Sequence, residues 1–246
     1  MHALAFLLLA HLAAAPGSPG RPVPLELTNN KPFVPVTVNG STPQWFILDT
    51  GCSGTSIVAR ETAERLKLAL GAEARADVGA GSGADVRISQ AKQPVTLVAL
   101  GETLTVVEPR LLTLGHVARY EGRRVDGLLG GDFMFRHVVT LDYADRTIAV
   151  GDTTASVPPP GALVVPLDLD TGWPVAAGTI TPRGGKPIPC RMIVDTGVRG
   201  VVTLFAPFSA AHGLVDASGS LPDLVVGGGA GGLTRGDVVR LEALTM

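Results

Sequence analysis

The chain has 246 residues, of which 31 are glycine and 19 are proline, and its formal net charge is −2. This many helix-breaking residues disfavour a helical bundle and favour short strands joined by tight turns. The small net charge and the absence of a Lys/Arg run exclude the electrostatic signature of a protein that binds nucleic acid or an acidic membrane.

The first 15 residues resemble a secretory signal peptide. An apolar core over residues 3–12 is followed by Ala13-Ala14-Ala15 and then by a stretch of Pro, Gly and Ser. The apolar core is too short to span a bilayer stably. We therefore expect a signal peptide over residues 1–15, an exported protein (periplasmic or secreted) and no stable membrane span.

Short strands and turns are predicted along the rest of the first half. Val34, Val36 and Val38 alternate as in a strand, and Asn39-Gly40 predicts a hairpin turn before a strand at 45–48. A short helix is predicted over 60–70, with Gly71 at its C-terminal cap. Further strands are predicted at 95–100, 104–107, 138–143 and 147–150, before a stiff connector at 157–160.

An Asp-Thr-Gly segment occurs twice, each time after an apolar run that can form a buried strand. The two acids, Asp49 and Asp195, are 195 − 49 = 146 residues apart, and the same offset aligns 81–84 with 227–230 without a gap. Upstream the offset is 142, so the second copy has four extra residues, which we place in the turn at 183–186. The repeat predicts two lobes, over residues 16–156 and 157–246, with one acid each.

The second copy is shorter than the first. In the first copy an apolar-apolar-Gly motif, Leu128-Leu129-Gly130, is followed by Asp132-Phe133. The counterpart of Gly130 would fall near position 276, beyond Met246. We therefore expect an incomplete second lobe of low stability.

Two carboxylates held close together have a chemistry of their own. They cannot both ionise cheaply, so the pair shares one proton. The ionised acid can then take a proton from a water molecule between them, while the proton of its partner stabilises the attacked carbonyl oxygen. Such a pair needs no nucleophilic Ser or Cys.

These motifs resemble those of the pepsin and retropepsin-like aspartic proteases, and most closely the bacterial group with two copies in one chain. The resemblance implies an all-β, bilobal acid-protease fold built from two internally repeated lobes. It also implies that Asp49 and Asp195 form the catalytic dyad. By the same resemblance Thr50 and Thr196 brace the two loops through their hydroxyls, and Gly51 and Gly197 permit the turns.

The resemblance further implies two glycine-rich hairpins, or flaps, that close over an extended peptide or protein substrate. The flap glycines are Gly79, Gly81 and Gly83 in the first copy and Gly227 and Gly229 in the second. Ordinary hairpin turns are the alternative interpretation of these segments. One departure from the family pattern is that Cys52 and Val198 follow the two Asp-Thr-Gly segments, where many members have a small polar residue or alanine.

The cysteines and histidines indicate no cofactor. Cys52 and Cys190 occupy different places in the repeat, so we expect two small buried thiols rather than a disulfide bond. The five histidines show no paired spacing of the kind that binds a metal ion.

The sequence thus predicts an aspartic endopeptidase that hydrolyses peptide bonds. One alternative is a peptide-binding module with the same fold and no catalysis. Another is a homodimer whose dyad is Asp49 from each chain, although we favour a monomer.

Overall fold

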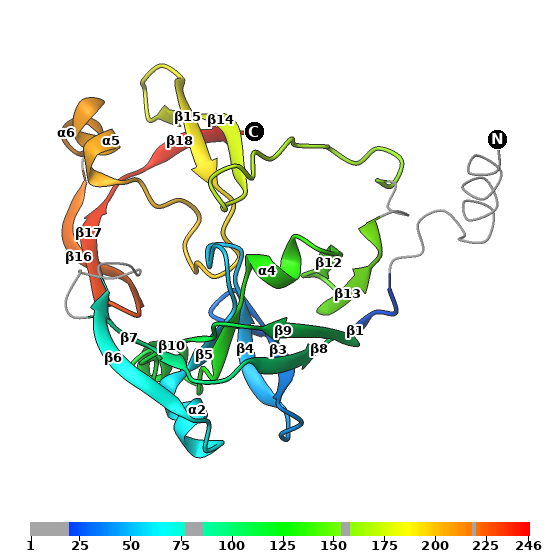
Figure 1. Ribbon diagram of the computed structural model, residues 1–246. Helices are drawn as coiled ribbons and strands as arrows, with labels where there is room; N and C mark the ends of the chain where they lie inside the picture. Colours follow the sequence, from blue (N-terminus) through cyan, green and yellow to red (C-terminus); the bar gives the residue numbers. More distant parts are fainter. Residues whose placement is uncertain (1–19, 77–85, 154–157, 218–219) are drawn as a thin grey trace.

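The computed structural model describes residues 20–76, 86–153, 158–217 and 220–246, and these form a mostly β protein (Figure 1). The predicted signal peptide, the flap glycines Gly79, Gly81 and Gly83, and Val157 of the predicted connector lie outside the described residues. We call residues 20–153 the first lobe and residues 158–246 the second lobe. No helix among the described residues has the length and apolarity that a membrane crossing requires.

A ten-stranded sheet forms the centre of the first lobe. Nine strands follow the order β6-β7-β10-β5-β11-β4-β3-β8-β9, and β2 pairs with β3 outside this path. The strands are β2 (Glu26–Thr28), β3 (Lys31–Val38), β4 (Gln44–Leu48), β5 (Ile57–Ala59), β6 (Leu70–Ala76), β7 (Val86–Ala91), β8 (Val95–Ala99), β9 (Glu102–Val106), β10 (Arg110–Leu112) and β11 (Gly127–Leu129).

Strand β11 connects the parts of this sheet that position the first acid. It runs parallel to β4, with Leu128 opposite Ile47, and antiparallel to β5. The carbonyl of Leu129 accepts a hydrogen bond from the amide of Asp49 at 3.0 Å. The helix α4 (Gly131–Met134) follows directly. The apolar-apolar-Gly motif is therefore the strand that holds the end of β4.

Apolar side chains cover both faces of β4. Phe46 and Leu48 are buried in one core cluster with Val36 and Leu129, whereas Ile47 is buried in a second cluster with Phe33. A strand buried on both faces has a continuous apolar run rather than alternating apolar and polar residues. This explains the uninterrupted Phe46-Ile47-Leu48 sequence before the acid.

A small sheet closes the first lobe. Its order is β1-β13-β12, with β1 at Val23–Pro24, β12 at Val138–Asp142 and β13 at Thr147–Gly151. The last two strands form the predicted hairpin, and Arg146 adopts the left-handed backbone conformation in its turn, with φ 51°.

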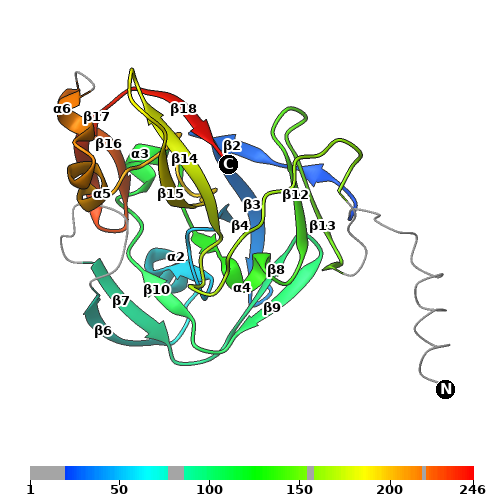
Figure 2. The same cartoon turned by 90° about the horizontal axis from the view of Figure 1, so that it is seen from above.

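The second lobe has two small sheets (Figure 2). One has the order β15-β14-β18, with β14 at Val175–Pro182, β15 at Ile188–Ile193 and β18 at Leu241–Thr245. The other is the hairpin of β16 (Leu221–Gly229) and β17 (Gly232–Val238). Two short helices, α5 (Ala206–Ala211) and α6 (Leu214–Ala217), lie between the sheets in the sequence.

The predicted repeat is present in the structure. The helix α5 begins 206 − 60 = 146 residues after α2 (Arg60–Arg65), and β18 begins the same distance after β8. Phe33 pairs with Ile47, and Val175 pairs with Ile193. The offset is therefore 142 before each hairpin turn and 146 after it, which confirms that the extra residues lie in the turn between β14 and β15.

The predicted helix over 60–70 is too long. The helix α2 ends at Arg65 because Lys67 adopts the left-handed conformation, with φ 57°, and the amide of Leu68 bonds back to the carbonyl of Ala63 at 2.9 Å. Leu70 and Gly71 belong to β6. The short helix α3 (Ala118–Glu121) was not predicted.

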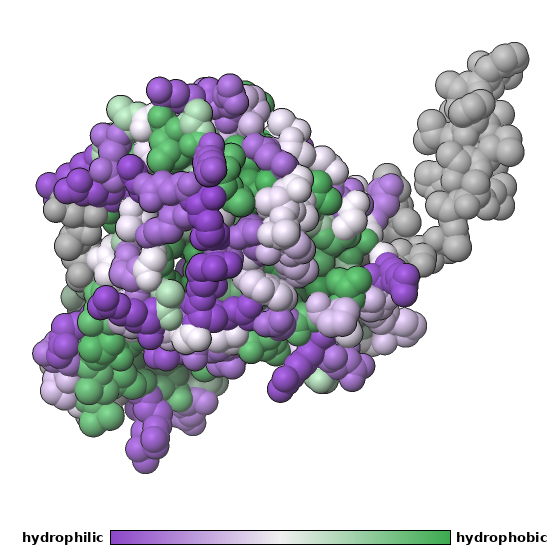
Figure 3. Space-filling view, turned by 90° about the horizontal axis from the view of Figure 1, so that it is seen from below, coloured by the Kyte–Doolittle hydropathy of each residue, from purple (hydrophilic) through white to green (hydrophobic). Residues whose placement is uncertain are grey.

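On the face of the molecule in Figure 3, apolar side chains form separate patches among hydrophilic ones. A surface of this mixed kind is ordinary for a globular protein, since apolar atoms contribute more than half of most protein surfaces.

Candidate active site

The two Asp-Thr-Gly loops meet between the lobes. The loop after β15 descends toward the end of β4 (Figure 1). A side-chain carbon added to Gly51 would lie 2.4 Å from Oδ2 of Asp195, and one added to Gly197 would lie 2.5 Å from Oδ1 of Asp49. The backbone of each loop thus passes directly against the carboxylate of the other, and only glycine permits that approach. The structure brings together the two acids that were predicted as a pair.

Thr50 and Thr196 connect the loops by reciprocal hydrogen bonds. The amide of Thr50 donates to Oγ1 of Thr196 at 3.1 Å, and the amide of Thr196 donates to Oγ1 of Thr50 at 2.9 Å. Each hydroxyl in turn donates to a carbonyl of the opposite strand end, Thr50 to Val194 at 2.6 Å and Thr196 to Leu48 at 2.7 Å. Four bonds therefore cross between the lobes directly behind the acids.

The electrostatic environment of Asp49 favours its protonated form. Burial, the charge of Asp195 and a hydrogen bond between the two carboxyl groups raise the pKa of Asp49 to about 7. The backbone amides of Cys52 and Gly51 act in the opposite direction, and the Cys52 amide donates to Oδ1 of Asp49 at 3.0 Å. In the other loop the amide of Gly197 donates to Oδ1 of Asp195 at 2.7 Å. The pair therefore retains a proton near neutral pH.

The two cysteines are free thiols, but the expectation that both are buried was wrong. Cys52 and Cys190 are half-buried. Burial, together with the charge of Asp49, raises the pKa of the Cys52 thiol above its usual range. The thiol of Cys52 donates to the carbonyl of Thr55 at 3.4 Å. A thiol that stays protonated is a poor nucleophile, so Cys52 contributes packing rather than chemistry.

Ser56 and Asp132 fasten the segment behind the first acid. The hydroxyl of Ser56 donates to Oδ1 of Asp132 at 2.6 Å and accepts the amide of Gly130 at 3.0 Å. The amide of Gly131 donates to the carbonyl of Cys52 at 3.0 Å. The sequence marks Asp132 only as part of a motif, and no pattern in it distinguishes Ser56 from an ordinary serine, so this serine was missed.

Asp126 is a fully buried acid below the site. Its oxygens accept bonds from the amide of Trp45 at 2.9 Å, Oγ1 of Thr62 at 2.8 Å, Arg65 at 2.7 Å and Arg124 at 2.7 Å. Burial alone would raise the pKa of Asp126, but these hydrogen bonds outweigh it and lower the pKa. The ionised acid joins α2 to the start of β4, and so fixes the strand that carries Asp49.

Trp173 extends from the second lobe to the first acid loop. Its indole Nε1 donates to the carbonyl of Gly51 at 2.9 Å, although the side chain is 38% exposed. Gly51 also contacts the carboxylate of Asp195, so Trp173 lies at the rim of the dyad. No motif in the sequence singles out this tryptophan.

Gly227 and Gly229 lie at the end of β16, where they pair with Thr234 and Gly232 of β17. The prediction of a hairpin here is confirmed. The end of the β16–β17 hairpin contacts the first lobe near α3, where His116 Nε2 donates to the carbonyl of Gly229 at 2.9 Å. The flap glycines of the first copy fall between β6 and β7, outside the described residues.

In this mostly β protein, one Asp-Thr-Gly loop from each of the two lobes meets its counterpart. The sequence profile of the aspartyl protease family matches residues 34–133, from β3 through Asp49 and β11 to Phe133. The match covers 100 of the 246 residues, all of them in the first lobe, and supports a relationship to the aspartyl protease family. No curated protein sequence matches the chain at a significant level.

Proposed function

We propose that the protein is an aspartic endopeptidase that hydrolyses peptide bonds with a water molecule activated between Asp49 and Asp195. The observation that carries this proposal is the contact of each acid with the loop of the other. Gly51 lies against Asp195, Gly197 lies against Asp49, and four threonine bonds hold the loops in that arrangement. Because the pKa of Asp49 is about 7, its carboxyl group can carry the proton that the two acids share.

The proposed reaction uses one ionised and one protonated carboxyl group. The ionised carboxylate takes a proton from water, whose oxygen bonds to the carbonyl carbon of the peptide, while the other acid gives its proton to the carbonyl oxygen. Transfer of a proton from the first acid to the amide nitrogen then breaks the C–N bond. The products are a carboxylic acid and an amine, and the second acid regains its proton from the intermediate.

The substrate is an extended peptide. Each lobe contributes a pair of antiparallel strands, β6 with β7 in the first lobe and β16 with β17 in the second, and exposed strands bind a peptide largely through its main chain. Trp173 contributes an aromatic side chain at the rim. The leader-like residues 1–15 favour an exported enzyme, so we place its substrates outside the cytoplasm.

The test is cleavage of a mixed peptide library between pH 4 and pH 8, with products identified by mass spectrometry. The purified chain should cut, and Asp49→Asn should lower the rate at least 10³-fold. Asp145→Asn, at an exposed aspartate in the β12–β13 turn, is the matched control and should cut like the unmodified chain. Equal cleavage by the chain and by Asp49→Asn would overturn the proposal.

A second candidate is a peptide-binding module without catalysis. It is favoured by the exposure of apolar residues in the second lobe. Because these residues are exposed, the Asp195 loop is less enclosed than the Asp49 loop. This candidate predicts peptide affinity that neither Asp49→Asn nor Asp195→Asn changes, with no cleavage by any of the three proteins. A homodimeric dyad is a third candidate, and light scattering that shows only monomer removes it.

A further inference from the structure

The turn at residues 169–174 carries Trp173 from the second lobe to the first acid loop. The indole Nε1 of Trp173 donates to the carbonyl of Gly51 at 2.9 Å, and the backbone amide of Ser53 donates to the same carbonyl at 3.1 Å. A carbonyl oxygen has two lone pairs, so both acceptor positions of Gly51 are filled. Because Ser53 belongs to the same loop as Gly51, the indole is the donor that can leave without a change in the loop.

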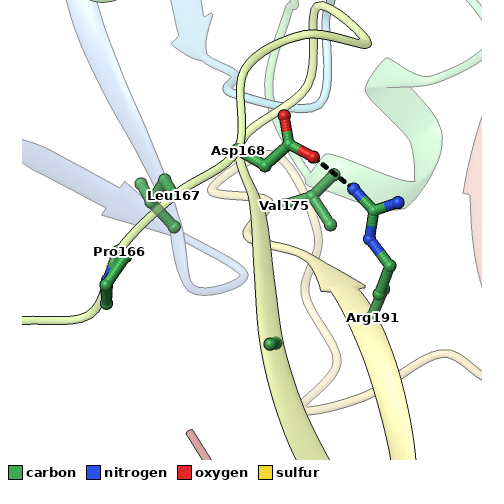
Figure 4. Close-up of a pocket in the computed structure, with 6 residues that line it drawn as sticks. Pro166, Leu167, Asp168, Val175 and Arg191 are labelled. Carbon is green, nitrogen blue, oxygen red and sulfur yellow. Dashed lines mark hydrogen bonds and ion pairs between the residues drawn. The ribbon is translucent and has the colours of Figure 1, made fainter.

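The base of this turn is held by bonds of its own. Asp168 and Val175 exchange both of their backbone hydrogen bonds at 2.9 Å, and Arg191 of β15 donates to the carboxylate of Asp168 at 2.5 Å (Figure 4). The carbonyl of Pro174 accepts the amide of Val194 at 2.8 Å. The base of the turn is therefore fixed to the second lobe, while its tip contacts the first acid loop.

Each lobe sends such a turn to the acid loop of the other lobe. The repeat offset of 172 − 30 = 142 aligns Asn30 with Gly172, and the offset of 199 − 53 = 146 aligns Ser53 with Arg199. Asn30 Nδ2 donates to the carbonyl of Arg199 at 3.4 Å. A carbon added to Gly172 would lie 3.7 Å from Cβ of Ser53, which is van der Waals contact. The repeat therefore places a turn against an acid loop on both sides of the dyad.

The two sides differ at the next residue of the turn. The counterpart of Trp173 is Lys31, which is buried and donates to Glu121 at 2.5 Å rather than to an acid loop. The contact between turn and loop is kept on the side of Lys31, so packing of the turn does not require the indole bond. The side chain of Trp173 is also 38% exposed. These observations favour a role of Trp173 at the site over a role in folding.

The Gly51 carbonyl belongs to the loop that touches the second acid. A carbon added to Gly51 would lie 2.4 Å from the carboxylate of Asp195. An extended peptide bound through its main chain presents amide N–H groups beside the acids, and an N–H that leaves water without an acceptor weakens binding. A peptide amide can bond to Gly51 only after the indole N–H has left. This step rests on the proposed function, since it requires a peptide between the lobes.

We propose that Trp173 is a substrate-binding residue whose indole N–H takes the place of a main-chain amide of the substrate at the Gly51 carbonyl. When a peptide binds, the indole leaves, and a peptide amide donates to the same oxygen. Indole and amide are both neutral donors with one hydrogen, so the exchange replaces one bond by a similar one. Trp173 therefore lowers the affinity for a peptide by the strength of the bond that has to break.

The first measurement follows the indole by NMR. The chain has two tryptophans, so isotope labelling of tryptophan gives two indole N–H signals, which Trp45→Phe assigns. The probe is the decapeptide that immobilised Asp49→Asn chain retains most strongly from a random library. On addition of this decapeptide to Asp49→Asn, the Trp173 signal should shift and its exchange with solvent should quicken about tenfold, as its bond to Gly51 opens. The Trp45 signal is the internal control and should stay in place.

The second measurement uses Trp173→Phe, which keeps an aromatic ring and removes the N–H. In the Asp49→Asn background this variant should bind the decapeptide about fivefold more tightly, which is the effect of one hydrogen bond. In the unmodified background kcat/KM should rise by the same factor through KM. Tyr143→Phe, at an exposed aromatic residue after β12, is the matched control and should bind like its parent. A residue that only positions the acid loop would instead lower kcat.

Three results would overturn the inference. The first is that no decapeptide is retained by a chain whose β3 and β4 amides are protected from exchange. The second is a Trp173 signal that does not move when the decapeptide binds. The third is an affinity that Trp173→Phe leaves unchanged or weakens.

The inference and the proposed function fail separately, because the signal and the affinity are measured without cleavage. If the decapeptide displaces the indole and the unmodified chain cuts no peptide, the proposed function is wrong and the inference holds. If the unmodified chain cuts the library and the indole signal does not move, the inference is wrong and the proposed function holds.

Discussion

Thr50 and Thr196 each accept the backbone amide of the other on their hydroxyl oxygens, at 2.9 and 3.1 Å. The two residues come from different lobes and are 146 positions apart in the chain. Because each hydroxyl also donates to the opposite strand end, the loops can only move together. The position of one acid is thereby fixed relative to the other.

Replacing Thr50 by valine should damage both stability and activity. The change removes one donor and one acceptor, and it leaves the Val194 carbonyl and the Thr196 amide without their partners. Loss of such half-buried bonds costs about 2 kcal/mol. Urea denaturation measures that loss, and Thr50→Ser, which keeps the hydroxyl, should restore most of it. Thr105→Val, at an exposed strand position, should be close to neutral.

Adding a methyl group at Gly51 or Gly197 should separate the acids without removing either of them. The new carbon would lie 2.4 to 2.5 Å from carboxylate oxygens, so one loop has to shift. We expect Gly51→Ala and Gly197→Ala to lower kcat at least 100-fold, since misplacement by about 1 Å has effects of that size. Gly200→Ala is the control, because no atom lies within 4 Å of its added carbon. Unchanged kcat in the Gly51 and Gly197 variants would refute the contact.

The ionised state of Asp126 should support the fold above pH 4. The pKa of this acid is lowered from 3.8 in the folded protein, so its contribution is present above that value and is lost as the pH falls through the folded pKa. Asp126→Asn should reduce the free energy of unfolding by about 3 kcal/mol at pH 7, since it breaks a buried charge network. The difference in free energy of unfolding between Asp126→Asn and the unmodified chain should shrink below pH 3. A constant difference across that range would contradict the assignment.

Asp49 should show the opposite dependence. Its pKa rises from 3.8 to about 7 on folding, so the acid is protonated in both states below pH 3.8, and ionisation destabilises the fold as the pH rises through 7. A tenfold change in an acid's ionisation constant corresponds to about 1.4 kcal/mol. At pH 8 the free energy of unfolding of Asp49→Asn should therefore exceed that of the unmodified chain by about 2–4 kcal/mol. The advantage should disappear at pH 3. Denaturation curves at both pH values, with Asp145→Asn as control, measure it.

The repeated frame predicted much of this structure from the sequence. A fixed offset of 146 residues located the second acid, and the structure places α5 and β18 at the same offset from α2 and β8. Local signals also succeeded, as at Asn39-Gly40, where both residues have positive φ in the turn between β3 and β4. Such features depend on short-range chemistry or on self-similarity, and both are visible in one sequence.

Other features depend on contacts that only the fold creates. The end of α2 depends on Lys67 adopting a left-handed conformation, which lysine rarely does without tertiary support. Trp173 contacts Gly51 across 122 residues, and Ser56 contacts Asp132 across 76. A tryptophan or a serine at such a position has no local pattern that distinguishes it from its neighbours.

The rate of peptide cleavage by Asp195→Asn is the most direct test of a dyad formed within one chain. We predict that Asp49→Asn and Asp195→Asn each lose at least 10³-fold in kcat, and that the double variant loses little more, because residues that act as a unit are not additive. If Asp195→Asn cleaves at the rate of the unmodified chain while Asp49→Asn is inactive, Asp195 is not the partner of Asp49, and the central claim is wrong.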